Sequence, residues 1–158
     1  MGRADPAAPS QAAGHLGFTL AISTPAGYEP DAAIVAAAQA NCRVNGGAIE
    51  LGHDVRVAAR GADAVYTDVW ASMGQEKERE ERARTFAGYC VNAELMALAA
   101  PRAIFLHCLP AHRGDEVTDE VMDGPQSRVW DEAENRWYTE QALLYMLITG
   151  DETGESLG

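Results

Sequence analysis

The segment His107 to Gly114 (HCLPAHRG) brings a thiol and two imidazoles into one short stretch of chain. It directly follows the apolar run Ala103 to Leu106, which is typical of a buried strand, and its proline and glycine end that strand. Cys108 therefore lies in a loop at the carboxyl end of a predicted strand. Ligands bind at this end of the strands in open α/β sheets.

A second predicted strand, Ala64 to Thr67, ends in the same way at Asp68. The loop after it carries a hydroxyl at Ser72 and a turn-forming glycine at Gly74. If the two strands are neighbours, Asp68 and Cys108 meet at one edge of the sheet. A carboxylate at such an edge can bind an ammonium group, although a cap on a turn is its more ordinary role.

Two interpretations of Cys108 follow from the residues alone. A thiol beside a histidine can form covalent acyl intermediates, but adjacent residues on a strand point to opposite faces, so His107 and Cys108 are not expected to touch. A small buried hydrophobe is the ordinary alternative. Nearby cations favour the thiolate, and we expect His112 and Arg113 to position the loop.

Predicted strands and helices alternate along the rest of the chain, which favours a parallel sheet covered on both faces. Asp31 is expected to cap the first helix. An acidic capping box from Asp131 to Glu134 is expected to cap the last helix. The predicted strands are Phe18 to Ser23, Ala48 to Leu51, Asp63 to Thr67 and Ala103 to His107. The predicted helices are Ala32 to Asn41, Asp54 to Arg60, Glu76 to Arg84, Ala93 to Ala99, a short one from Thr118, and a long one with Trp137, Leu143, Leu144 and Leu147 on one side.

The length of 158 residues suits one domain, and no apolar run approaches the about 20 residues that span a bilayer. A net charge of −12 argues against nucleic-acid or membrane partners. Three cysteines without metal-type spacing predict no metal site and fit the cytoplasm. We expect residues 1–14 to be a disordered leader or a cloning remnant, residues 15–150 to fold, and residues 151–158 to be a flexible tail.

Several segments stand in one order across residues 15–150 and together resemble ornithine carbamoyltransferases: DVW at 68–70, SMGQ at 72–75, Phe86 to Asn92, HCLPAHRG at 107–114 and VWDEAENR at 129–136. The resemblance implies a three-layer, Rossmann-like α/β domain that binds ornithine. It also implies a cofactor-independent reaction of arginine biosynthesis, in which the carbamoyl group of carbamoyl phosphate passes to the δ-amine of ornithine, giving citrulline and phosphate.

The resemblance also assigns roles to individual residues. It implies that Asp68 binds the α-amino group of ornithine, and that Cys108 lines the junction between the two substrates. Cys108 and Arg136 are the expected catalytic residues, because they would orient the reactants. The expected substrate-binding residues are Asp68, Ser72, Met73, Cys108, Leu109 and Arg136.

Two features of the family do not appear in this sequence. One is the amino-terminal domain, which binds carbamoyl phosphate through a Ser-Thr-Arg-Thr type loop and a His-Pro-x-Gln segment. The other is the first, central strand of the sheet, which has no counterpart in residues 1–14. We therefore expect a sheet with two unpaired edges. The chain should either form a homo-oligomer through those edges or be only marginally stable, and it should have no activity alone.

Two functions stay open on this basis. The chain is either a carbamoyltransferase fragment that keeps part of the ornithine site, or a non-enzymatic truncated module that pairs with another carbamoyltransferase subunit. A nucleotide-binding Rossmann-like domain is a weaker third idea, because no Gly-x-Gly-x-x-Gly motif follows a predicted strand. Putrescine and acetylornithine stay possible as acceptors, although the segments 72–74 and 107–110 favour ornithine.

Overall fold

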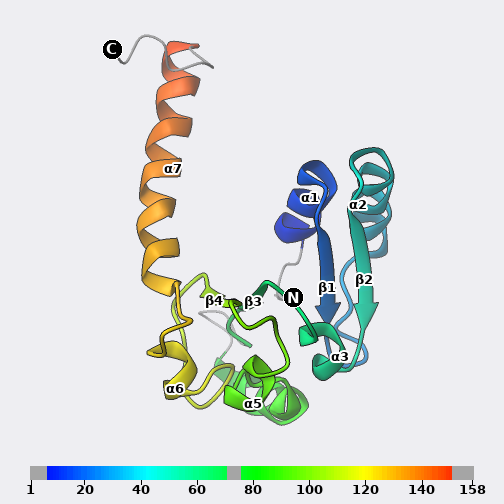
Figure 1. The fold of residues 1–158 in the computed structure, drawn as a ribbon, viewed down its shortest axis with the longest axis vertical. Helices are drawn as coiled ribbons and strands as arrows, with labels where there is room; N and C mark the ends of the chain where they lie inside the picture. The colour runs from blue at the N-terminus through cyan, green and yellow to red at the C-terminus, as the bar shows by residue number, and fades with distance from the viewer. Residues whose placement is uncertain (1–6, 71–75, 151–158) are drawn as a thin grey trace.

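The computed structural model describes residues 7–70 and 76–150 of the chain. Figure 1 shows an alternation of helices and short strands along the chain, as the sequence predicts. The elements are α1 (Ala7–Leu16), β1 (Thr19–Ser23), α2 (Ala32–Asn45), β2 (Ala48–Gly52), α3 (Val55–Ala59), β3 (Ala64–Thr67), α4 (Glu76–Thr85), the 3-10 helix η1 (Ala87–Tyr89), α5 (Ala93–Met96), β4 (Ile104–His107), α6 (Asp119–Met122) and α7 (Val129–Thr149).

The described strands form two parallel pairs. β1 pairs with β2, from Thr19 opposite Ala48 to Ser23 opposite Gly52, and β3 pairs with β4 over their full lengths. A mixed α/β fold with parallel strands is therefore confirmed. Among the described residues no hydrogen-bonded ladder joins β1 to β3, so the strands form two ladders with unpaired edges.

The larger hydrophobic core surrounds the β3–β4 pair. Side chains alternate along β4, so that Phe105 and His107 are buried while Ile104 and Leu106 are half-buried. The outer edge of β4 exchanges backbone hydrogen bonds with Gln126 and Arg128, which covers that side of the strand. The buried members of this core are Ala59, Val65, Val91, Leu95, Met96, Phe105, Val117, Val121, Met122 and Val129.

A smaller core lies between α1, α2 and β2. Ser10 and Ala13 of α1 are fully buried, and a side chain added at Gly14 would meet the Ala38 carbonyl and Asn41 Cβ at 3.0 Å. The prediction that residues 1–14 are a disordered leader is wrong for residues 7–14. The stretch gives little apolar periodicity because its contact residues are small, and small residues are what allow the two helices to approach closely.

The capping prediction is right for α2 and wrong for α7. The Asp31 side chain accepts a hydrogen bond from the Ala33 amide at 2.8 Å, and the helix continues past the predicted end to Asn45. α7 begins at Val129, so Asp131 and Glu134 lie inside it rather than at its cap. The acidic residues still favour the first turns, because they face the positive end of the helix dipole.

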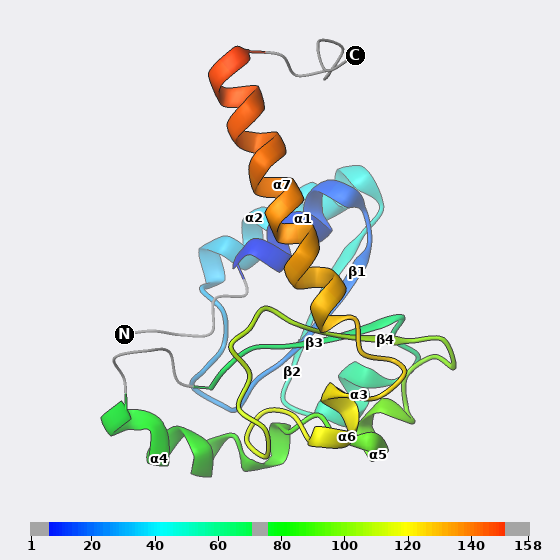
Figure 2. The ribbon, with the colours of Figure 1, turned by 90° about the vertical axis from the view of Figure 1, so that its left-hand side faces the viewer.

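The carboxyl-terminal half of α7 extends away from the rest of the fold (Figures 1 and 2). Trp137, Leu144 and Leu147 lie on the predicted apolar side of this helix, with 64%, 58% and 73% of each residue exposed. The apolar side of an amphipathic helix is usually buried against the rest of the protein. The described residues do not bury this side of α7.

Substitution at the exposed end of α7 should hardly affect stability. Leu147→Gln removes an exposed apolar side chain but keeps a good helix former, so we expect a change below about 0.5 kcal/mol in the free energy of unfolding, measured by urea titration. Val129→Ala at the fully buried start of the same helix should cost at least about 1 kcal/mol. A large loss from Leu147→Gln would mean that the end of α7 is packed in solution.

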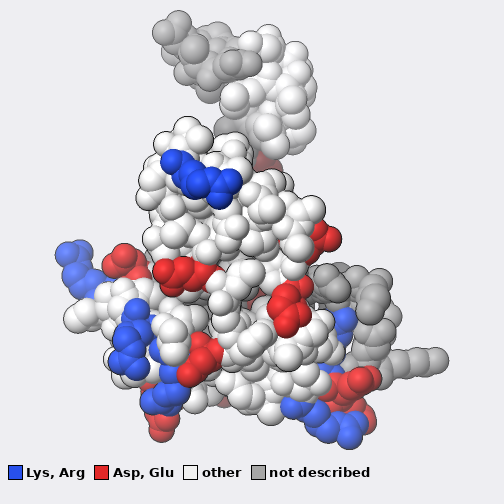
Figure 3. All heavy atoms as spheres, turned by 90° about the vertical axis from the view of Figure 1, so that its right-hand side faces the viewer, with Lys and Arg blue, Asp and Glu red and all other residues white. Residues whose placement is uncertain are grey.

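Charges on the surface are mixed. Figure 3 shows basic and acidic side chains interspersed over the face that it presents, and no basic patch gathers on that face. Among the described helices, none combines the length and the apolar character needed to cross a membrane.

Candidate functional site

The two loops that the sequence singles out meet at the carboxyl ends of β3 and β4. Thr67 and His107 are paired residues in the parallel register, so the next residues, Asp68 and Cys108, leave the two strands side by side. The Cys108 thiol donates a hydrogen bond to Asp68 Oδ1 at 3.0 Å. A thiol and a carboxylate 40 positions apart in the sequence thus share one half-buried site.

Asp68 is oriented by its own loop, and Cys108 has a second partner. The Val69 amide donates to Asp68 Oδ1 at 2.7 Å, which fixes the carboxylate toward the thiol. The Tyr66 hydroxyl forms a hydrogen bond with Cys108. Burial raises the pKa of Tyr66, and Cys108 raises it further, so this hydroxyl stays protonated. Tyr66 is not among the residues predicted from the sequence, although alternation along β3 puts it on the same side as Asp68.

The thiol form of Cys108 is favoured over the thiolate. Burial raises the pKa of Cys108, and Asp68 raises it through both a hydrogen bond and its charge, which together outweigh the lowering by Tyr66. The expectation that nearby cations favour the thiolate is therefore wrong. Arg113 cannot act on the thiol because it binds Asp119 at 3.0 Å and Asp123 at 2.5 Å instead, an interaction that lowers the pKa of Asp123.

The Cys-His nucleophile has no geometric support. His107 is 1% exposed, and its ring faces the core, where Nε2 lies 3.2 Å from Glu116 Oε1 and Nδ1 lies 2.9 Å from the Leu109 amide nitrogen. Both ring nitrogens therefore have partners other than Cys108. The opposite orientation of adjacent strand residues accounts for this separation.

The pKa of Cys108 predicts a measurable pH dependence. At pH 8, alkylation of Cys108 by iodoacetamide should be slower in the folded chain than in the urea-unfolded chain, because a raised pKa leaves less thiolate and burial limits access. The folded profile should be displaced to higher pH. Peptide mass spectrometry separates Cys108 from Cys42 and Cys90. Equal or faster reaction of the folded chain would contradict the raised pKa.

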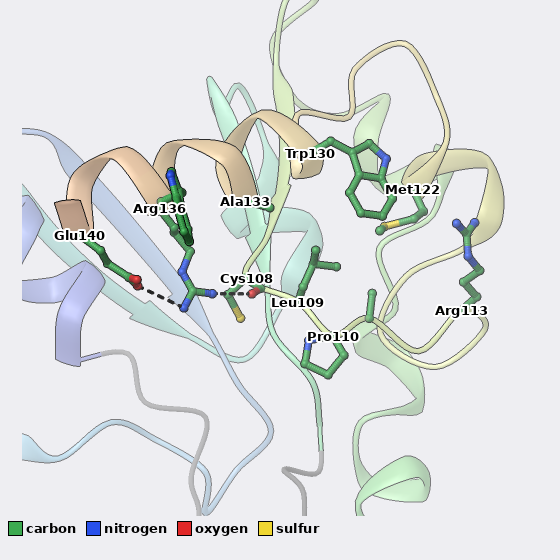
Figure 4. A pocket seen from close by; sticks show the side chains of 11 residues that line it. Cys108, Leu109, Pro110, Arg113, Met122, Trp130, Ala133, Arg136 and Glu140 are labelled. Atoms are coloured by element: carbon green, nitrogen blue, oxygen red, sulfur yellow. Dashed lines mark hydrogen bonds and ion pairs between the residues drawn. The ribbon is translucent and has the colours of Figure 1, made fainter.

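The first turns of α7 are fastened to the end of β4. Arg136 Nη1 donates to the Cys108 carbonyl at 3.2 Å, and its Nη2 lies 3.8 Å from Glu140 Oε1 (Figure 4). Glu132 Oε2 accepts from the His107 amide at 2.9 Å. The guanidinium of Arg136 is largely exposed, so it keeps donors for a ligand while it holds the Cys108 backbone.

A cavity of about 660 Å³ lies between the 108–113 loop and α7. Figure 4 shows Cys108, Leu109 and Arg136 along one side of it, with Trp130 and Met122 at the other end. Leu109 enters it from a left-handed backbone conformation, with φ of 56°, just before a cis peptide bond to Pro110. The lining residues are Cys108, Leu109, Pro110, Ala111, Arg113, Met122, Trp130, Ala133, Arg136, Trp137 and Glu140.

The structure brings together Asp68, Cys108, Leu109 and Arg136 from the set that the sequence proposes. Ser72 and Met73 lie outside the described residues. Trp137 and Glu140 line the cavity without having been singled out for it, although their spacing from Arg136 and Ala133 along one helix could have indicated this. In the described part of the chain, no group of three or more His, Cys, Asp or Glu residues is placed to hold a metal ion.

Comparison with known proteins gives a consistent result. Residues 10–147 match the family model described as "Aspartate/ornithine carbamoyltransferase, Asp/Orn binding domain". The ornithine carbamoyltransferase of Methylococcus capsulatus is 59% identical over 138 residues, which are 87% of this chain and 44% of that protein. The chain therefore spans less than half the length of this curated relative.

Solved structures agree with the sequence matches. The ornithine carbamoyltransferase from Pyrococcus furiosus superimposes with a TM-score of 0.83 at 48% identity, over 89% of this chain and 46% of that one. An acetylornithine transcarbamylase complexed with acetylcitrulline superimposes with a TM-score of 0.76 at 31% identity, over 87% of this chain and 42% of that one. The chain belongs to the aspartate/ornithine carbamoyltransferase family and corresponds to its Asp/Orn binding domain.

Proposed function

We propose that this chain supplies the ornithine-binding part of an ornithine carbamoyltransferase. The contact between Cys108 Sγ and Asp68 Oδ1 carries the proposal, because it joins the two loops into one polar site beside an open cavity. A carboxylate at that point suits a cationic amine, and the apolar wall of the cavity suits the methylene chain of an amino acid. Ser72 and Met73 are proposed to complete the amino acid site.

The proposed reaction requires the δ-amine of ornithine in its neutral form. Its lone pair attacks the carbonyl carbon of carbamoyl phosphate and a carbon–nitrogen bond forms. The bond from that carbon to the phosphate oxygen breaks, and the phosphate leaves with the proton that the nitrogen loses. Arg136 offers its free guanidinium donors to an oxygen of carbamoyl phosphate. Asp68 holds the α-amino group, and Cys108 and Leu109 line the place where the amine meets the carbonyl. In these roles Cys108 and Arg136 are the proposed catalytic residues.

Stand-alone turnover is not part of the proposal. Carbamoyl phosphate is a multiply charged anion, whereas the cavity is lined by only two arginines among the described residues, and Arg113 is already paired with carboxylates. We propose that the remaining phosphate ligands come from the portion of a carbamoyltransferase that this chain does not span. The unpaired cysteines are suited to a reducing compartment, which supports a cytoplasmic location.

Calorimetric titration and a citrulline assay test the function. We expect saturable binding of ornithine to the chain, weaker binding of putrescine and acetylornithine, and no citrulline from ornithine and carbamoyl phosphate with the chain alone. Putrescine lacks the α-carboxylate and acetylornithine lacks the free α-amine, so they serve as matched controls for the two ends of the amino acid head group. Absence of ornithine binding, or tighter binding of acetylornithine, would overturn the acceptor assignment.

The strand edges support a further proposal about assembly. In the described residues, β1 forms a ladder only with β2, and β3 forms one only with β4. The other edge of β1 and the other edge of β3 are therefore unpaired there. We propose that these edges pair with a strand of another chain, in the first instance a second copy, because unpaired edges recruit strands. Sedimentation velocity over a hundredfold range of concentration should reveal a dimer. A monomer at every concentration would refute the pairing.

A further inference from the structure

We propose that Glu116 and His107 are positioning residues that set the conformation of the Cys108–Leu109 peptide in the substrate site. Neither residue contacts the cavity, and neither belongs to the substrate-binding set. The proposal concerns how the site is held in shape, and its importance for ligand binding rests on the proposed function.

The two side chains form a buried pair beneath the loop. Glu116 and His107 are each 1% exposed, and Glu116 Oε1 lies 3.2 Å from His107 Nε2. The Leu109 amide donates to His107 Nδ1 at 2.9 Å, so Nδ1 carries no proton and the ring proton is on Nε2, directed at the carboxyl group. Glu116 thereby selects the tautomer that can accept from Leu109.

The peptide unit between Cys108 and Leu109 is held at both ends. Its N–H group donates to His107, and its carbonyl oxygen accepts from Arg136 Nη1 at 3.2 Å. The carbonyl faces α7 and the N–H group faces the core. Rotation of this peptide is blocked in both directions, so the Cys108 thiol is aimed at Asp68 and the Leu109 side chain lies along the cavity.

Leu109 needs this support because its backbone conformation is uncommon. Its φ of 56° lies in the left-handed region, which costs a leucine roughly 1 kcal/mol or more and persists only when the surroundings impose it. Glu116 Oε1 also accepts from the His112 amide at 2.5 Å, which fastens the far side of the same loop. One carboxyl oxygen therefore organises both ends of the 107–112 segment.

A purely structural role explains the pair less well. Burying an ionisable pair rarely adds stability over an apolar pair of the same size, and Glu116 Oε2 has no hydrogen-bond partner among the described residues. What the pair does provide is a single orientation for a peptide that borders the cavity. Residues of this outer layer are known to change ligand affinity by about 10- to 100-fold in metal sites, and we expect the lower end of that range here.

The test compares Glu116→Ala and Glu116→Gln with Glu120→Ala, an exposed position in the next helix. Cys108 is alkylated in each variant of the 158-residue chain with and without ornithine, and urea titration checks folding. We expect Glu116→Ala to speed alkylation of Cys108 and to require about tenfold more ornithine for the same protection. Glu116→Gln keeps an oxygen that accepts from His107, so its alkylation rate and the ornithine concentration needed for protection should stay within about threefold of those of the parent chain. Both quantities should be unchanged in Glu120→Ala.

A measurement on the unmodified chain covers the case in which Glu116→Ala fails to fold. Nitrogen-15 chemical shifts of the His107 ring should report the proton on Nε2, and a proton on Nδ1 would overturn the proposal. Unchanged alkylation and protection in a folded Glu116→Ala chain would also overturn it. If ornithine protects Cys108 in no variant, the proposed function fails, while faster alkylation of Glu116→Ala without ornithine still supports the positioning role.

Discussion

Replacing Phe105 by alanine is expected to remove about 3–5 kcal/mol from the free energy of unfolding, which is a large fraction of the about 5–15 kcal/mol that native domains possess. Phe105 is fully buried at the centre of the larger core, in the strand that also carries His107. The surrounding side chains come from helices, strands and loops, so they cannot close together over the lost ring. Urea titration followed by far-ultraviolet circular dichroism measures the loss.

Phe18→Ala is the matched control, since the same atoms are removed where 42% of the residue is exposed. Its cost should stay below about 1 kcal/mol, because an exposed ring contributes little transfer free energy. Similar costs at the two positions would mean that the β3–β4 core is loosely packed. If Phe105→Ala fails to fold while Phe18→Ala folds, the stability of the chain depends on this one core.

The elements with a strong pattern are the ones that sequence reasoning locates. β4 follows from a compact apolar run ended by Pro110, and α2 from Asp31 followed by an alanine-rich stretch, and both agree with the structure to within a few residues. α1 could not be found in this way, because its buried side chains are a serine and an alanine. Burial there depends on a close approach between two helices, which no local pattern encodes.

The family resemblance predicts two unpaired edges in the sheet, but the sequence does not say which strands pair. Alternating strands and helices predict parallel strands, but they do not say which edges stay unpaired. Hydrogen bonds between β1 and β2, and between β3 and β4, account for all of the ladder pairing among the described strands. Each ladder joins two strands that are consecutive in the chain, with Thr19 opposite Ala48 in the first and Ala64 opposite Ile104 in the second.

The candidate site shows the same division. The convergence of Asp68 and Cys108 follows from two strand ends and a parallel register, so it could be expected from sequence. The protonation of the thiol could not, because the raised pKa of Cys108 depends on burial and on the hydrogen bond and charge of Asp68. The support of the Leu109 backbone by Glu116 could not be predicted either, because Glu116 acts on Leu109 only through the ring of His107.

Asp68→Asn is expected to weaken ornithine binding by about 10- to 100-fold. Asparagine has almost the same shape and can still accept from the Val69 amide, but it loses the charge that would attract an α-ammonium group. A hydrogen bond to a charged group is worth about 1.5–3 kcal/mol, and each 1.4 kcal/mol corresponds to a factor of ten. Calorimetric titration of both proteins with ornithine at one ionic strength measures the difference.

Asp63→Asn separates a local effect from a change in overall charge. Asp63 is exposed immediately before β3, at the opposite end of that strand from Asp68, so the substitution removes one negative charge without touching the site. We expect its ornithine affinity to stay within about twofold of the parent chain, because exposed charges at this distance are screened by salt. Equal losses in the two variants would mean that Asp68 acts only through net charge, and the ammonium-binding role would then have to move to another residue.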